Sequence, residues 1–202
     1  MKINNVLDEH TTYEVLITTR NIDGTVHTKP FGIKLIDNKL ILNLFPNTTL
    51  KNIQSNPNFK VQFSLNPLIY TKAFFNKLNK MDYIENEVLV CSDYIIDAKV
   101  EDILRFIQYD DYGTSVYYRI TANIINFKKL KNRMSTINRS TNIILDLLIK
   151  ASRFYLMNSE EKNQLINEIN KNYKFILKEG NQDHLDSLNL IKKEMNKLLK
   201  KI

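Results

Sequence analysis

The sequence is poor in the residues on which several common kinds of functional site depend. Its 202 residues include four Gly and a single cysteine, Cys91. Four glycines are too few for the glycine-rich nucleotide loops of Rossmann or Walker proteins. A lone cysteine excludes an intramolecular disulfide and a cysteine-rich metal cluster, and it suits a reducing cytoplasm. The three histidines, His10, His27 and His184, lie far apart without metal-ligand spacing, so we expect no metal site.

Long apolar runs are also missing. No stretch approaches the roughly 20 residues of a membrane-spanning helix, and the first residues lack the apolar core of a signal peptide. The hydrophobic fraction of 43% and the charged fraction of 25% are ordinary for a folded soluble protein. We therefore expect a cytoplasmic protein with no membrane partner, built as one large domain or as a domain with an appendage.

The net charge of +7 is unevenly distributed along the chain. Residues 1–127 contain 13 Lys and Arg against 14 Asp and Glu, whereas residues 128–202 contain 16 against 8. Such an asymmetry raises nucleic acid as a partner. The basic segment lacks the interleaved aromatic residues of a single-stranded nucleic-acid surface. We therefore favour solvated helix faces over nucleic-acid binding and keep the latter as an alternative.

Alternating apolar residues predict an antiparallel, barrel-like body. The clearest pair of strands is residues 33–35 and 40–44, with a turn at Asp37-Asn38 between them. Pro30 cannot donate a hydrogen bond to a strand ladder, so we expect it at a strand end or an exposed edge. The other segments predicted as strands are residues 13–20, 25–30, 60–65, 88–90, 98–107 and 115–127.

A short helix is expected directly after the strand at residues 40–44. Asn47 or Thr48 is a natural N-cap, and Pro57 stops the helix after about two turns. The first turn of a helix leaves backbone N–H groups unpaired, and these can bind a phosphate. The alternative is a helix capped by its own side chains. The side chains that would complete a phosphate site are those of Thr48, Thr49, Lys51 and Asn52.

From about Met134 the apolar period changes to that of helices. The fold class is therefore mainly β plus α, with a barrel domain at residues 1–132 and a helical domain at residues 133–202. The adjacent acids Asp110 and Asp111 fit a solvated turn better than a catalytic pair. The predicted helices span residues 68–80, 143–151, 159–177 and 185–198.

Five separated segments together resemble one known family. They read YEVLITTRNIDGT, KPFG, FPNTTLKN, FSLN and INRSTNIILDLLIKASRF. In order and spacing they resemble an uncharacterised archaeal family of FMN-binding split-barrel proteins that is related to the flavin reductases. The resemblance includes the helical C-terminal region. It implies a closed barrel of about six strands that forms a homodimer, with FMN in the groove between subunits.

The resemblance also implies which residues contact FMN. Thr49 and Asn52 match the family's Thr-x-x-Asn at the FMN phosphate, and Asn47 stands where a Ser is usual. An Asn-Arg pair opens the long helix, here Asn138 and Arg139, and Arg139 is a candidate for a second anion contact. Arg139 could instead pair with a carboxylate.

The flavin ring is implied at a second segment. Pro30, Phe31 and Gly32 match the family's Ala-Pro-Met-Gly, whose backbone is expected to pass the edge of the ring. Lys29 replaces Ala and Phe31 replaces Met there, so Phe31 either stacks on or crowds the ring, or belongs to the core. Asn66 stands where an Asp is common in the family, after the strand that contains FSL.

The resulting hypothesis is an FMN-dependent oxidoreductase that uses a small-molecule electron donor or acceptor. A bound flavin carries out the redox chemistry, and the protein supplies position and electrostatics. The sequence shows no Ser-His-Asp, Cys-His or acid–base pair that indicates other chemistry. A flavin-binding or carrier protein without turnover, and a nucleic-acid-associated protein, are the alternatives.

Overall fold

The computed structural model describes residues 7–85, 87–110, 113–131 and 138–200. The chain divides into two compact units. The first consists of residues 1–64 and 79–133, and the second of residues 65–78 and 134–202.

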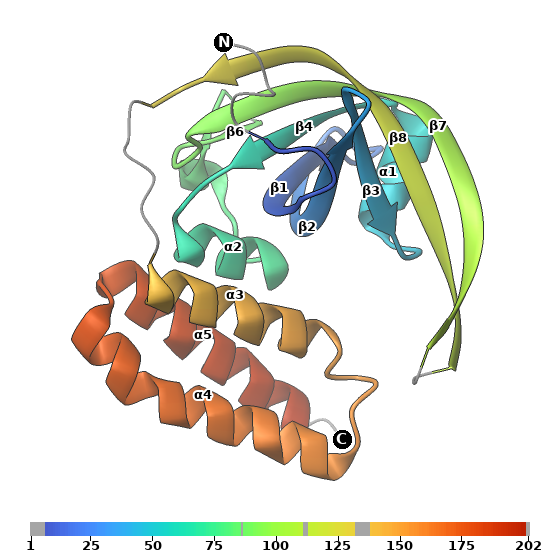
Figure 1. The fold of residues 1–202 in the computed structure, drawn as a ribbon. Coiled ribbons are helices and arrows are strands. Elements are labelled where there is room, and N and C mark those ends of the chain that lie inside the picture. The colour runs from blue at the N-terminus through green and yellow to red at the C-terminus, as the bar shows by residue number, and fades with distance from the viewer. Residues whose placement is uncertain (1–6, 86, 111–112, 132–137, 201–202) are drawn as a thin grey trace. The chain divides into compact units, whose positions relative to one another are not determined.

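The first unit is a closed barrel of six antiparallel strands in the order β1-β2-β3-β8-β7-β4 (Figure 1). A separate two-stranded sheet is formed by β5 (Tyr83–Ile84) and β6 (Val88–Leu89). The predicted antiparallel barrel is therefore confirmed. Its strands are β1 (Thr12–Arg20), β2 (Val26–Ile36), β3 (Lys39–Leu44), β4 (Asn58–Phe63), β7 (Tyr94–Asp110) and β8 (Gly113–Lys129).

The hairpin of β2 and β3 forms as the sequence predicts. Asp37 and Asn38 form its turn, with φ angles of 51° and 60°. These left-handed angles suit a two-residue hairpin turn, and Asp and Asn tolerate them better than most residues. The turn sets Ile36 opposite Lys39 and directs the alternate apolar residues into the barrel core. The fully buried members of this hairpin are Ile33, Leu35, Leu40, Leu42 and Leu44.

Pro30 lies within β2, which runs without a break from Val26 to Ile36. It is opposite Leu16 of β1, but β3 pairs only with residues 33–36 of β2. Among the described strands, residues 26–32 of β2 thus have a neighbour on one side only, where a proline is tolerated. The expectation of an exposed edge is confirmed, and the expected break between two short strands is wrong.

The strands β7 and β8 extend beyond the predicted ranges at both ends. Their pairing shifts register between Asp97 and Ala98 and between Val100 and Asp102. A register shift breaks the period-two alternation on which the sequence-based boundaries depend. The shift between Asp97 and Ala98 lies at the predicted start of β7, so residues 94–97 were left out of the prediction.

The second unit is helical. α3 (Arg139–Ser152), α4 (Ser159–Glu179) and α5 (Gln182–Leu199) run alongside one another (Figure 1), and α2 (Pro67–Phe74) packs against α3 and α5. The predicted boundary placed residues 65–78 in the barrel domain. The structure assigns them to the helical unit, because α2 buries its apolar residues with those helices.

Lysines of the helical unit are partly neutralised by neighbouring acids. Lys150 contacts Asp146 at 2.8 Å and Glu168 at 2.6 Å, and Lys197 contacts Glu194 at 2.9 Å. The positive charge of this segment is therefore interrupted by acids along the helix surfaces. No helix in the described part of the chain is both long enough and apolar enough to span a membrane.

Candidate functional site

The N-terminus of α1 (Thr48–Ser55) presents unpaired backbone donors. Asn47 is the N-cap: its Oδ1 accepts the N–H of Leu50 at 2.9 Å, and its carbonyl accepts that of Lys51 at 3.2 Å. Within the described chain, the N–H groups of Thr48 and Thr49 have no assigned acceptor, as expected for the first turn of a helix. These two donors can bind an anion.

The two threonines of this turn face different surroundings. The side chain of Thr48 is exposed, whereas Thr49 is only 1% exposed. Thr49 Oγ1 lies 3.1 Å from His27 Nε2 on β2. The hydroxyl of Thr49 is therefore engaged by His27 and is not displayed to solvent.

Asn52 connects α1 to the β1–β2 hairpin. Its Nδ2 donates to Thr19 Oγ1 at 2.9 Å and to Asn21 Oδ1 at 2.8 Å. A side-chain amide has two N–H donors, so both are used. Thr49 and Asn52 do share one face of α1, as the sequence predicts, but that face is turned toward the hairpin. Asn52 thus fixes the helix in place and offers no free donor.

His27 and Lys29 form a basic face beside this helix, and neither is among the predicted site residues. They lie two residues apart on β2, opposite Thr19 and Ile17 of β1, so they share one face of the strand. Burial and the charge of Lys29 lower the pKa of His27, and burial lowers the pKa of Lys29. The alternation in HTKPFG, residues 27–32, is the signal that could have indicated this face.

The opposite face of the hairpin is fixed by a buried polar network. Thr28 Oγ1 lies 2.8 Å from Thr18 Oγ1, and the Tyr83 hydroxyl donates to Thr28 Oγ1 at 3.0 Å. Gln62 Nε2 donates to Thr18 Oγ1 at 2.7 Å. These contacts fix one face of β1 and β2. They therefore also fix the orientation of the opposite face, which carries His27 and Lys29.

The segment Pro30, Phe31 and Gly32 continues along β2 from this basic face. Phe31 is partly buried and packs against the barrel core, and its contact with the flavin ring stays a prediction. Gly32 lies opposite Glu14, and a Cβ on it would be 3.1 Å from Thr12 Cγ2. A larger residue at position 32 would therefore crowd β1.

The remaining predicted contacts belong to the helical unit, where two of them are helix caps. Asn66 Oδ1 accepts the N–H of Leu68 at 2.9 Å, and its Nδ2 donates to Asp183 at 3.0 Å. Asn138 caps α3 by accepting the N–H of Ser140 at 2.8 Å, and Arg139 follows it as the first residue of that helix. Capping accounts for both asparagines, and a role of these residues in FMN binding stays a prediction.

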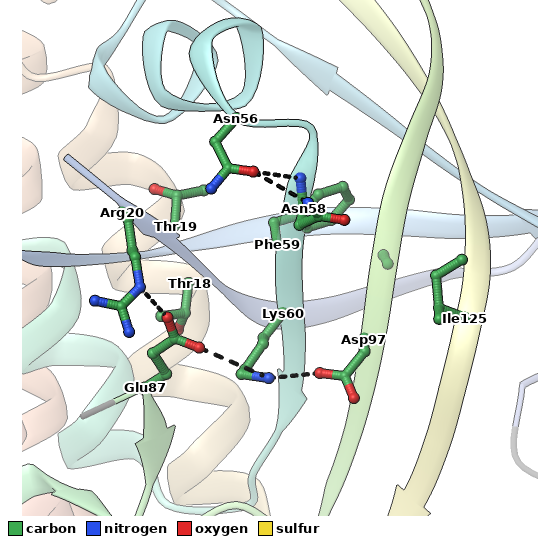
Figure 2. A pocket seen from close by; sticks show the side chains of 11 residues that line it. Thr18, Thr19, Arg20, Asn56, Asn58, Phe59, Lys60, Glu87, Asp97 and Ile125 are labelled. Carbon is green, nitrogen blue, oxygen red and sulfur yellow. Dashed lines mark hydrogen bonds and ion pairs between the residues drawn. The ribbon is translucent and has the colours of Figure 1, made fainter. Parts of the chain in front are cut away.

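A pocket of about 160 Å³ opens beside the β1–β2 hairpin of the barrel (Figure 2). Lys60 lies 2.5 Å from Asp97 and 3.7 Å from Glu87, and Glu87 also pairs with Arg20. The four charges balance, so this chain of ion pairs connects neighbouring segments and leaves no net charge to attract a ligand. No group of three or more potential metal ligands is present among the described residues.

Comparison with known proteins identifies relatives along nearly the whole chain. The models of the N-terminal and C-terminal domains of a protein family of unknown function, DUF447, match residues 13–131 and 138–193. An uncharacterised protein of Methanocaldococcus jannaschii is 25% identical over 193 residues, which cover 92% of this chain and 98% of that protein.

One solved structure shows the same fold over nearly the whole chain. An FMN-bound DUF447 protein from Methanosarcina mazei has a TM-score of 0.75 at 16% identity, covering 94% of this chain and 96% of that one. A flavoredoxin from Methanosarcina acetivorans has a TM-score of 0.47 at 16% identity, over 67% of this chain and 77% of that one. The first match confirms the predicted split barrel with C-terminal helices. Since the two family models together span most of the sequence, the chain belongs to the DUF447 family.

Proposed function

We propose that the protein binds FMN and acts as a flavin-reductase-like oxidoreductase with a small-molecule electron donor or acceptor. The observation that carries this proposal is the set of donors beside the start of α1: two unpaired N–H groups with His27 and Lys29. A phosphate monoester carries nearly two negative charges and accepts several hydrogen bonds, which fits these donors. The family member from Methanosarcina mazei, which has the same fold, is FMN-bound.

The residues have separate roles in this proposal. The N–H groups of Thr48 and Thr49 bind the phosphate, with positive charge from Lys29. The backbone of residues 30–32, on the edge of β2 where β3 does not pair, offers polar groups to the flavin ring. The flavin supplies hydride or electron transfer, and the protein supplies orientation and electrostatics.

The first prediction tests the cofactor and its turnover. Titration of the purified protein is expected to show saturable FMN binding and clearly weaker riboflavin binding, because riboflavin lacks the phosphate. The bound FMN is then mixed anaerobically with NADH, NADPH or a reduced deazaflavin, and the loss of oxidised-flavin absorbance is followed. Reduction by one of these donors supports the oxidoreductase. Binding without reduction by any of them would favour the carrier, and equal affinities for FMN and riboflavin would contradict the phosphate site.

The second prediction is a homodimer with FMN in the groove between subunits. Two-fold dimers are the commonest oligomers, and β7 and β8 expose apolar side chains that suit an interface, including Leu104 and Ile107 at 48% and 49% exposure. Light scattering is expected to give twice the chain mass of 23.8 kDa. The double variant Leu104→Glu with Ile107→Glu is expected to shift the protein toward monomer.

A matched control for this experiment is Ile22→Glu, since Ile22 lies in the β1–β2 turn and is 95% exposed. This change is expected to leave the mass unchanged. A parent protein that stays monomeric at micromolar concentration would argue against the shared groove.

A further inference from the structure

We propose that His27 couples FMN binding to the uptake of one proton, so that this imidazole recognises the charge of the phosphate. This proposal rests on the proposed function. It gives His27 the role of taking up a proton, which Thr49 and Asn52, the residues expected at the phosphate, do not have. It follows from the position of His27 and from the charges around it.

The imidazole is adjacent to the phosphate donors of α1. Its Nε2 lies 3.1 Å from Oγ1 of Thr49, the second residue of the helix, whose own N–H is one of the two unpaired donors. The backbone of His27 is held by β1, because it pairs with Thr19, whose Oγ1 also contacts the carbonyl of His27 at 3.4 Å. The imidazole ring is therefore fixed in a position where it would contact an anion bound at the first turn of α1.

Lys29 supplies the positive charge that acts on His27. On its own strand, Lys29 shares its face. On β1, Arg20 points to the other face of the sheet and pairs with Glu87. On α1, Lys51 is exposed to solvent, and the neighbouring Asn52 is neutral.

These surroundings favour the neutral imidazole in the free protein. Burial and the charge of Lys29 lower the pKa of His27 below its ordinary value of 6.5. A phosphate dianion next to the ring reverses this balance, because an opposite charge at short range favours the protonated form. The pKa of His27 therefore rises when FMN binds.

The proton comes from solvent and binds the unprotonated ring nitrogen. The resulting imidazolium donates its Nε2–H to a phosphate oxygen, and the hydroxyl of Thr49 is released to donate to the same group. Uptake occurs at pH values between the lower pKa of the free protein and the higher pKa of the complex. FMN affinity is therefore expected to increase as the pH falls from 8.5 to 6.5, by at most about tenfold per pH unit for one proton. In this range the phosphate, whose second pKa is about 6, stays mostly dianionic.

The test compares the parent with His27→Gln, which keeps a neutral donor near the position of Nε2 but cannot titrate. FMN and riboflavin are titrated at pH 6.5, 7.5 and 8.5. Calorimetry in Tris and in PIPES, two buffers with different ionisation enthalpies, counts the protons taken up. The parent is expected to take up a proton with FMN and none with riboflavin. His27→Gln should lose this uptake and bind FMN about 5- to 10-fold more weakly at pH 6.5, with little difference at pH 8.5.

A second variant keeps the test decisive if His27→Gln folds poorly. Burial lowers the pKa of His27 most and the charge of Lys29 lowers it further; Lys29→Met removes the second cause, so the pH range of proton uptake should move upward. FMN binding by the parent without proton uptake, or equal uptake in the parent and His27→Gln, would overturn the role of His27 and leave the FMN site standing. Failure of the parent to bind FMN at any pH would instead remove the proposed function and this inference with it.

Discussion

Thr49→Val is expected to weaken FMN binding by roughly 5- to 150-fold, which corresponds to about 1–3 kcal/mol for the loss of a hydrogen bond in a largely buried site. Valine keeps the shape of threonine but removes the hydroxyl that lies 3.1 Å from His27 Nε2. In the complex this removes one donor to the phosphate, and in the free protein it removes the contact that orients the imidazole. Riboflavin has no phosphate, so its affinity should change little.

Two controls separate this effect from damage to the helix. Thr49→Ser restores the hydroxyl and should recover most of the FMN affinity. Ser55→Ala removes a hydroxyl at the other end of α1, where Ser55 Oγ contacts the carbonyl of Lys51, and it should not affect FMN. Binding is measured by the change in flavin fluorescence on titration. If Thr49→Val binds FMN as the parent does, the hydroxyl contributes nothing to the phosphate site.

Much of the fold was predictable because its signals are local. The turn at Asp37-Asn38, the cap at Asn47 and the stop before Pro57 each depend on residues adjacent in the sequence, and the structure contains all three. The start of β7 was not predictable, since the register shift beside it arises from pairing between β7 and β8. The helix α2 was found, but only tertiary packing determines that it belongs with the C-terminal helices.

The candidate site was likewise predictable where its signals are local and not where it depends on tertiary packing. The spacing of Thr49 and Asn52 correctly indicated that they share a face of α1, but not that the face is covered by the hairpin. His27 is 22 residues from Thr49 in the sequence, and no pattern on either segment indicates the contact between them. For the asparagines at positions 66 and 138 the sequence predicts a contact with FMN, but helix capping accounts for both residues without a ligand.

Asn52→Ala is expected to lower the free energy of unfolding by roughly 1–3 kcal/mol and to weaken FMN binding at the same time. Asn52 is buried, and its two amide donors bind Thr19 and Asn21. Alanine leaves both acceptors without their donors and opens a gap between α1 and the hairpin. Because β2 carries His27 and Lys29 on that hairpin, a shift of α1 separates its N–H groups from the basic face.

The comparison with Asn58→Ala distinguishes this positioning role from the general cost of losing an asparagine. Asn58 is exposed, and within the described part of the chain its side chain hydrogen-bonds only to the nearby Asn56, at 3.2 Å, so its loss should cost little stability or FMN affinity. Unfolding in urea gives the stability, and titration at a temperature where every variant is folded gives the affinity.

Riboflavin binding distinguishes two explanations for weaker FMN binding by Asn52→Ala. If Asn52 positions the phosphate donors, Asn52→Ala weakens FMN far more than riboflavin. Equal weakening of both ligands would show that the change distorts the ring side of the site, and the link from Asn52 to the phosphate would then be wrong.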